Sequence, residues 1–286
     1  MKHLLLAAAF AAIATLPSCG KSSRAVIQNR GSDTMAEVAQ AWSEDYRKVH
    51  PVVAVSVSGG GSQSGITGLI DGTVDIANCS REFKPEEVEA ARKKGRDPVK
   101  HHVGWDGIAI YVHKDNPIQS ISKEQLMQIY SDGGKVTKWS DLGIKLPSGE
   151  DEMVLISRQS NSGTYEYFRE AVLGKETNFR LGTRDMNGSK DVVDLCSKVT
   201  SGIGYSGLSY ATSEVRIVPV TNAKTGAAVA PSTDSVLDGT YPISRPLFMY
   251  TIGAPQGEVA KYLDWVKGDE GQRVLLRMGY PPLRKV

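Results

Sequence analysis

In the first hundred positions of the chain, the pattern of apolar residues predicts a strand followed by a helix three times. Short runs rich in β-branched residues, Val26–Asn29, Val52–Val57 and Val74–Ala77, predict strands. After the first two runs, apolar residues recur three and four positions apart and predict helices, and the polar stretch Lys84–Lys94 predicts a third helix. The repeated strand–loop–helix order predicts an α/β domain with a mostly parallel sheet.

The three loops of this predicted domain are rich in small polar residues. They are Gly31–Met35, Ser58–Gly65 and Asn78–Arg81. Ligands of parallel α/β sheets bind at the carboxyl ends of the strands, where such loops lead into helices. We therefore expect all three loops to open on the same edge of the sheet.

Two further apolar strands suggest how a second domain is attached. Trp105–His113 leads out of the first domain and Leu247–Ile252 leads back, and no low-complexity linker lies between them. We expect two α/β lobes joined by these hinge strands, with a ligand cleft between the lobes. Lobe I is residues 26–112 plus 245–286, and lobe II is residues 113–244.

The second lobe contains one stretch with clear anion chemistry. The apolar run Val154–Ile156 leads into Arg158–Thr164, read as Arg-Gln-Ser-Asn-Ser-Gly-Thr, and Tyr165–Val172 follows with helical spacing. A helix N-terminus has free N–H groups and a partial positive charge, which suits a tetrahedral oxyanion. The alternative is a capped helix beside a surface arginine.

Several catalytic and metal-binding motifs are excluded. The glycine run Gly60–Gly65 lacks the lysine of a nucleotide phosphate loop and has Gln63 where a hydrolase elbow has serine. His101 and His102 point to opposite faces of a strand, and no histidine lies beside a candidate nucleophile. We expect no enzyme, no metal site and no cofactor.

Composition indicates an ordinary globular protein. The 286 residues are 40% hydrophobic and 23% charged, with a formal net charge of +2. Without a basic stripe interleaved with aromatic residues, nucleic acid is not an expected partner.

The N-terminus indicates export. Lys2 precedes the apolar run Leu4–Ile13, which is too short to span a bilayer. Leu16–Gly20, read as Leu-Pro-Ser-Cys-Gly, resembles a bacterial lipobox. We therefore expect a signal peptide over residues 1–19, lipidation of Cys19, and a tether over residues 20–25. Of the other cysteines, Cys79 and Cys196 are either a disulfide or two buried thiols.

A set of motifs along the chain resembles the PstS-type phosphate-binding proteins, the extracytoplasmic receptors of bacterial phosphate ABC importers. The motifs are Gly31–Met35, Gly59–Gly65, Asp75–Arg81, Asp106–Ala109, Glu124–Leu126, Trp139–Gly143, Arg158 with Ser162–Thr164, and Gly279–Leu283. The resemblance covers nearly the whole mature chain. It implies the type II periplasmic-binding-protein fold, closing on phosphate through a hinge.

The resemblance also implies the ligand site. The candidate phosphate-binding residues are Thr34, Met35, Ser62, Ser64, Ser80, Asp106, Arg158, Ser162, Gly163 and Thr164. Many relatives have an aspartate where this chain has Ser80, and that aspartate accepts the proton of hydrogen phosphate. We expect another carboxylate to take this role, Asp106 first and Asp33 second, although both also fit turn or cap positions.

The sequence thus predicts a lipid-anchored monomer in the periplasm or on the cell surface, which passes phosphate to ABC permease subunits. Three alternatives remain: a receptor for sulfate or molybdate, a phosphoester hydrolase using Ser62 or Ser162, and a surface lipoprotein for adhesion or signalling.

Overall fold

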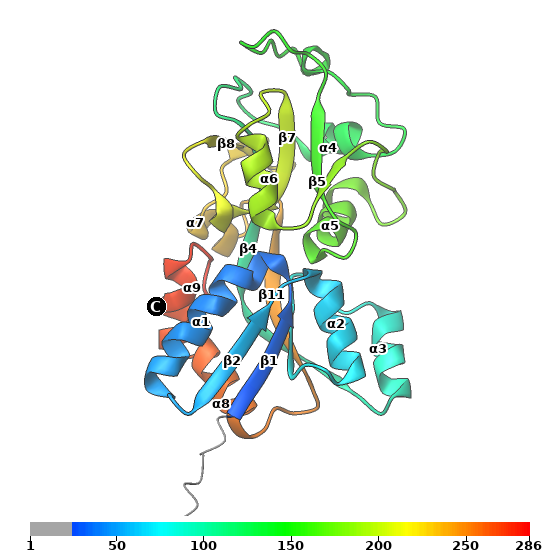
Figure 1. Ribbon diagram of the computed structural model, residues 1–286. Helices are drawn as coiled ribbons and strands as arrows, with labels where there is room; N and C mark the ends of the chain where they lie inside the picture. Colours follow the sequence, from blue (N-terminus) through cyan, green and yellow to red (C-terminus); the bar gives the residue numbers. More distant parts are fainter. Residues whose placement is uncertain (1–24) are drawn as a thin grey trace, which may run out of the picture.

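The chain folds into two lobes that lie one above the other (Figure 1). The computed structural model describes residues 25–286. Both ends of the described chain belong to the lower lobe, lobe I, and the middle of the chain forms lobe II. The predicted signal peptide, the lipidation of Cys19 and all of the tether except residue 25 lie outside the described residues.

Lobe I is built on a mixed sheet. Its strands, in spatial order, are β2 (Val53–Ser58), β1 (Ala25–Gly31), β3 (Ile76–Cys79), β11 (Ser244–Ile252) and the first part of β4 (Pro98–His113). The first three strands are parallel, as predicted, and β11 is antiparallel to both β3 and β4. The loops after β1, β2 and β3 therefore leave the same edge of the sheet.

Helices flank the lobe I sheet. They are the 3-10 turn η1 (Asp33–Met35), α1 (Ala36–Val49), α2 (Gly61–Asp71), α3 (Pro85–Lys93), α8 (Gly257–Lys267) and α9 (Asp269–Arg277). The apolar face of α1 places Trp42 and Tyr46 in a core with residues of α8 and α9. On the other side, Ile66 and Leu69 of α2 pack against Phe248 and Tyr250 of β11.

Lobe II is built on a second sheet. Its strands are the end of β4, β7 (Gly202–Gly207), β5 (Val154–Arg158), β6 (Arg184–Met186) and β8 (Val215–Val218), with a separate small pair β9 (Val220–Thr221) and β10 (Ala228–Val229). Its helical segments are α4 (Lys123–Tyr130), η2 (Trp139–Leu142), α5 (Gly163–Phe168), η3 (Arg169–Leu173), α6 (Ser189–Cys196), η4 (Leu208–Tyr210) and α7 (Thr233–Leu237). The strands β7, β5 and β6 are parallel to one another.

The hinge is a pair of crossing segments, as the sequence predicts. Up to Gly107, β4 pairs with β11 in lobe I, and from Ile108 onward it pairs with β7 in lobe II. The returning chain runs beside it, since the Ile108 amide donates to the Ile243 carbonyl at 2.8 Å. Residues 108–112 therefore belong to the lobe II sheet, whereas the sequence-based division places them in lobe I.

The two cysteines within the described chain are buried free thiols in different lobes. Cys79 lies in a core cluster of lobe I and Cys196 in one of lobe II. Of the two alternatives left open by the sequence, the structure therefore shows the buried thiols. Within residues 25–286, every helix is too short or too polar to cross a bilayer.

Candidate anion site

Hydroxyl groups from three loops of lobe I meet at the interface between the lobes. Thr34 lies in the η1 turn after β1, Ser62 in the first turn of α2, and Ser80 directly after β3. The Ser80 amide donates to the Ser62 hydroxyl at 3.1 Å, and the two hydroxyl oxygens are 3.4 Å apart. Ser32 adds a further hydroxyl, which donates to Ser80 at 2.9 Å. All four side chains are buried.

The N-terminus of α5 brings the lobe II part of the site against these hydroxyls. Thr164 and Thr34, one from each lobe, share a hydrogen bond of 2.8 Å between their side-chain oxygens. Gly163 lies so close that a Cβ atom there would be 2.4 Å from Ser62 Oγ and 2.6 Å from Ser80 Oγ. Loops of the two lobes thus meet at these residues.

Ser162 is the N-cap of α5. Its hydroxyl accepts hydrogen bonds from the amides of Thr164 and Tyr165, at 3.1 and 3.5 Å. The oxygen is therefore used as a cap, and the O–H proton is still a donor.

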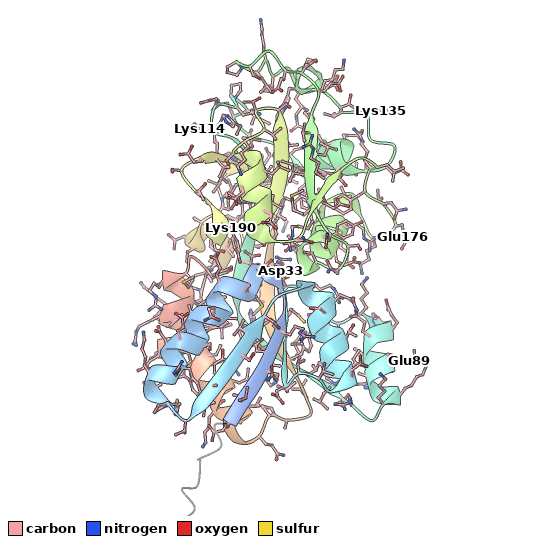
Figure 2. All side chains as sticks on the ribbon, in the orientation of Figure 1. Asp33, Glu89, Lys114, Lys135, Glu176 and Lys190 are labelled. Carbon is pink, nitrogen blue, oxygen red and sulfur yellow. The ribbon has the colours of Figure 1, made fainter. Side chains whose placement is uncertain are left out.

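Arg158 lies at the end of β5 with its guanidinium fully buried. It is held from within lobe II by the Ser189 hydroxyl and the Asn187 carbonyl, at 3.0 and 2.7 Å. Across the interface it donates to Asp33 Oδ2 at 2.9 Å. Asp33 itself lies where the two lobes meet (Figure 2). Burial lowers the pKa of Arg158, a shift that the Asp33 carboxylate opposes.

Two of the predicted site residues, Ser64 and Met35, use their polar groups within their own helical segments. The Ser64 hydroxyl donates to the Gly61 carbonyl at 2.9 Å, so it faces its own helix, and the structure does not bring it to the other hydroxyls. The Met35 amide donates to the Ser32 carbonyl at 3.0 Å within the η1 turn, while the Met35 side chain packs in the lobe I core.

Asp106 and Arg245 form a buried ion pair beside Thr34 and Thr164. They lie opposite each other on β4 and β11, and each side chain is 1% exposed. Nε and Nη2 of Arg245 donate to Asp106 Oδ2 at 3.1 and 2.8 Å. Nη2 also donates to the hydroxyls of Thr34 and Thr164, at 3.2 and 2.8 Å. This arrangement places a second guanidinium in the site.

The sequence interpretation missed Arg245, although the chain contains a signal for it. Buried residues alternate along the chain as it enters the predicted strand Leu247–Ile252. They are Ile243, Arg245 and Leu247, and the positions between them are Ser244 and Pro246. An arginine on the apolar face of a strand needs a buried partner. Asp106, inside the other hinge strand, is the matching charge.

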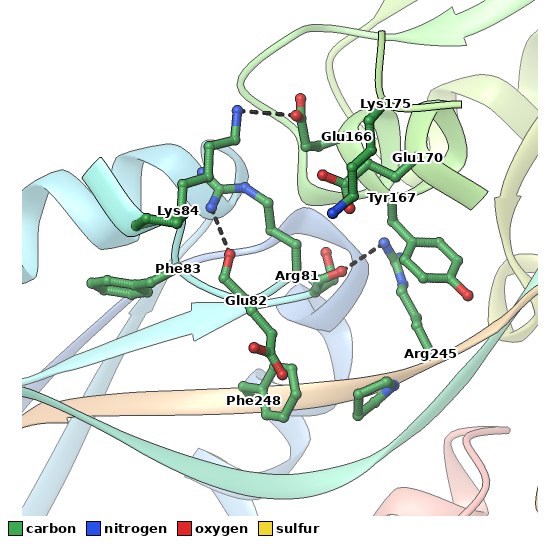
Figure 3. A pocket seen from close by; sticks show the side chains of 13 residues that line it. Arg81, Glu82, Phe83, Lys84, Glu166, Tyr167, Glu170, Lys175, Arg245 and Phe248 are labelled. Carbon is green, nitrogen blue, oxygen red and sulfur yellow. Dashed lines mark hydrogen bonds and ion pairs between the residues drawn. The ribbon is translucent and has the colours of Figure 1, made fainter. Parts of the chain in front are cut away.

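A cavity of about 400 Å³ adjoins the site on one side (Figure 3). Ser80 and Arg245 line it, together with aromatic side chains that include Phe83 and Tyr167. At this side Lys84 of lobe I and Glu166 of lobe II form an ion pair of 3.0 Å. The lobes are thus joined by two charge contacts, Lys84 with Glu166 and Arg158 with Asp33.

Among the described residues, neither a group of metal-ligating side chains nor a histidine ring contacts the hydroxyl cluster. Within residues 25–286, no three His, Cys, Asp or Glu side chains gather into a group able to hold a metal ion. The His101 and His102 rings are hydrogen-bonded to Thr251 and to the Gly104 carbonyl, both in lobe I. The arrangement suits reversible binding of an anion by many hydrogen bonds.

Comparison with known proteins agrees with this geometry. The model of the PBP superfamily domain matches residues 20–270. Phosphate-binding protein PstS of Pseudomonas aeruginosa is 36% identical over 264 residues, covering 88% of this chain and 81% of that protein. The chain belongs to the PstS-type phosphate-binding protein family.

A further relative and a solved structure match the chain over a similar length. Protein SphX of Synechococcus elongatus is 33% identical over 274 residues, covering 92% of this chain and 79% of that protein. A Clostridium perfringens protein, described as a phosphate ABC transporter substrate-binding protein and solved with bound phosphate, is 27% identical. Its TM-score is 0.79, and the match covers 91% of this chain and 100% of that one. The fold is the type II periplasmic-binding-protein fold predicted from the sequence.

Proposed function

We propose that this chain binds inorganic phosphate outside the cytoplasmic membrane and delivers it to the permease of an ABC importer. The observation that carries this proposal is the meeting of Thr34, Ser62 and Ser80 of lobe I with Gly163 and Thr164 of lobe II. Two buried guanidinium groups, Arg158 and Arg245, lie in the same region. A buried oxyanion is stabilised by such donors, at roughly 1.5–3 kcal/mol for each hydrogen bond to an ionised group.

The ligand set that we propose follows the structure. Thr34, Ser62, Ser80 and Thr164 supply hydroxyl donors, Gly163 supplies a backbone N–H group, and Arg158 supplies charge, whereas the Met35 amide donates to the Ser32 carbonyl. Ser162 holds the α5 N-terminus in position through its cap hydrogen bonds. The proposal does not require Ser64, whose hydroxyl faces the Gly61 carbonyl.

Asp106 is the acceptor that we propose for the proton of hydrogen phosphate. Its Oδ2 accepts a hydrogen bond from Arg245, whereas its buried Oδ1 makes no hydrogen bond to a side chain, and the Leu208 amide faces the carboxylate. A carboxylate oxygen accepts a hydrogen bond from the protonated oxygen of hydrogen phosphate. It repels the lone pairs of a fully deprotonated oxyanion. Asp33 is less suited, because its two oxygens already accept hydrogen bonds from Gly60 and Arg158.

The cellular setting follows from the family and the N-terminal sequence. The family consists of substrate-binding transport proteins. We propose that Cys19 carries a lipid that anchors a monomer to a bacterial membrane, in the periplasm or on the cell surface. We also propose that the chain is not an enzyme, since no described histidine contacts the serine hydroxyls.

Calorimetric titration with phosphate and with sulfate, repeated between pH 5.5 and 9, tests the function. Phosphate is expected to bind far more tightly than sulfate. Equal affinity for both anions, or a preference for sulfate or molybdate, would indicate a receptor for another oxyanion. Turnover of an aryl phosphate that is lost on Ser62→Ala or Ser162→Ala would indicate a hydrolase. Absence of oxyanion binding would favour the adhesion or signalling alternative.

A further inference from the structure

The guanidinium of Arg245 contacts residues of both lobes and of the hinge. Besides Asp106, Thr34 and Thr164, its Nη1 donates to the carbonyls of Ser80 and Gly163, at 2.8 and 3.0 Å. All three nitrogens of the guanidinium are thus engaged, with acceptors in lobe I, lobe II and the hinge. The group is therefore fixed in position and orientation.

The ion pair with Asp106 is one-sided. Both hydrogen bonds of the pair go to Oδ2, at 3.1 Å from Nε and 2.8 Å from Nη2. Oδ1 is buried and makes no hydrogen bond to a side chain, and the Leu208 amide is the backbone donor that faces the carboxylate. A Cβ atom on Gly207 would lie 3.1 Å from this Oδ1 and 3.4 Å from Thr34 Cγ2, so Oδ1 and the Thr34 methyl group both lie against Gly207. A carboxylate oxygen has two lone pairs, so Oδ1 is able to accept a further hydrogen bond.

We propose that Arg245 is a specificity-determining residue that acts through Asp106. By holding one oxygen of the carboxylate and leaving the other able to accept a further hydrogen bond, it makes the site select oxyanions that carry a proton. The inference rests on the proposed function and adds to it the residue that controls the choice between phosphate and sulfate.

The charges around Asp106 explain why Arg245 is needed. Burial raises the pKa of Asp106; Arg245 opposes this rise by charge and hydrogen bonding, and the Leu208 amide opposes it by a hydrogen bond. The other titratable groups that face the carboxyl are tyrosines from several elements: Tyr111, Tyr167, Tyr210, Tyr241 and Tyr280. Burial raises the pKa of each of these tyrosines, so they are neutral near pH 7. Arg245 is thus the cation that opposes protonation of the Asp106 carboxyl.

Without Arg245 the carboxyl changes its role. A buried carboxyl with no nearby cation takes up a proton at neutral pH, and its O–H becomes a hydrogen-bond donor. A hydrogen-bond donor at this position binds a fully deprotonated oxyanion such as sulfate as well as it binds hydrogen phosphate. Raising the pH removes the proton again and restores the acceptor.

The test compares the affinities of phosphate and sulfate by calorimetry between pH 5.5 and 9. The proteins are the wild type, Arg245→Gln, Arg245→Lys and Asp106→Asn, with the exposed Arg184→Gln as a control. We expect the preference for phosphate to fall at least tenfold at pH 7 in Arg245→Gln and Asp106→Asn. It should recover with rising pH in Arg245→Gln alone, and Arg245→Lys should retain most of it. The control should match the wild type.

The outcomes separate this inference from the proposed function. A wild type without a preference for phosphate would refute the function itself. If the wild type prefers phosphate and Arg245→Gln lowers the affinity for both anions equally at every pH, the role of Arg245 is structural. In that case only the inference fails. Should Arg245→Gln not fold, infrared difference spectra between the wild type and Asp106→Asn decide. An ionised carboxylate at pH 7 is expected, and a protonated carboxyl would overturn the inference.

Discussion

The guanidinium of Arg158, in lobe II, donates a hydrogen bond of 2.9 Å to the carboxylate of Asp33, in lobe I. The pair directly links the two sides of the interface, beside the Thr34–Thr164 contact. Since the arginine is fully buried and the aspartate is 19% exposed on its side chain, the contact depends on the lobes being together. Affinity for the anion and closure of the lobes are therefore expected to change together in variants of this region.

Arg158→Ala is expected to weaken phosphate binding more than tenfold, because it removes a buried cation from the site. It should also lower the thermal stability, since the Asn187 and Met186 carbonyls lose their donor. Calorimetry and thermal unfolding measure the two effects, with Arg184→Ala on β6 as an exposed control. An unchanged phosphate affinity would remove Arg158 from the site.

Two serines on α2 provide a matched pair of variants. Ser62→Ala removes a buried hydroxyl that faces Ser80 and Gly163, and should weaken phosphate binding by roughly tenfold to a hundredfold. Ser64→Ala removes a hydroxyl that is bonded to the Gly61 carbonyl, and should change the affinity less than about twofold. Equal losses in the two variants would show that the site extends further along α2 than we propose.

Gly163→Ala tests how closely the lobes approach. The added Cβ would lie 2.4 Å from Ser62 Oγ and 2.6 Å from Ser80 Oγ, which is shorter than any normal contact. Alanine is well accepted in the first turn of a helix, so the lobes should fold normally. We expect phosphate affinity to fall more than tenfold and small-angle X-ray scattering with excess phosphate to show a more open molecule. A compact, tight-binding variant would contradict the proposed interface.

Glu87 provides a test of pH dependence away from the anion site. Arg81 donates to both of its carboxylate oxygens at 2.8 Å, in a buried bidentate pair. Burial tends to raise the pKa of Glu87, but the hydrogen bonds from Arg81 and the Lys84 amide prevail, and the pKa is lowered. The pair therefore stabilises the folded protein above the ordinary glutamate pKa of about 4.3, and this stabilisation is lost as the pH falls through the lower native value.

Glu87→Gln should accordingly reduce the unfolding free energy by about 2 kcal/mol at pH 7. The difference from the wild type should shrink as the pH falls below about 4. Denaturant unfolding at several pH values measures this, and Glu89→Gln is the control, since the Glu89–Lys93 pair is mostly exposed. A difference that stays constant with pH would show that the carboxylate charge is not what stabilises α3.

Local patterns were sufficient for much of the molecule. The first two β-branched runs became β1 and β2, the apolar run Val154–Ile156 became β5, and the helical spacing after Met35 and Ile66 became α1 and α2. These elements form as predicted because the period of their apolar residues matches the face that each one buries. The run Val74–Ala77 overlaps β3 only in part, since that strand is Ile76–Cys79. The parallel order of the first three strands then places Thr34, Ser62 and Ser80 at one edge of the lobe I sheet. The lobe I part of the proposed site was therefore predictable from the sequence.

Other features depended on contacts between distant segments. Arg245 and Asp106 are 139 positions apart, and only the pairing of β11 with β4 brings them together. The orientation of Ser64 toward its own helix depends on where α2 begins, which apolar spacing does not determine.

The sequence by itself thus determined the strands, the helices and the polar loops, because each is encoded by neighbouring residues. The capping role of Ser162 at Arg158–Thr164 was also local. Only the tertiary structure decided the charge pairs, Arg158 with Asp33 and Arg245 with Asp106. The physical reason is that a buried charge is stabilised by whichever partner the fold places within hydrogen-bond distance, and that distance depends on how both lobes and the hinge pack.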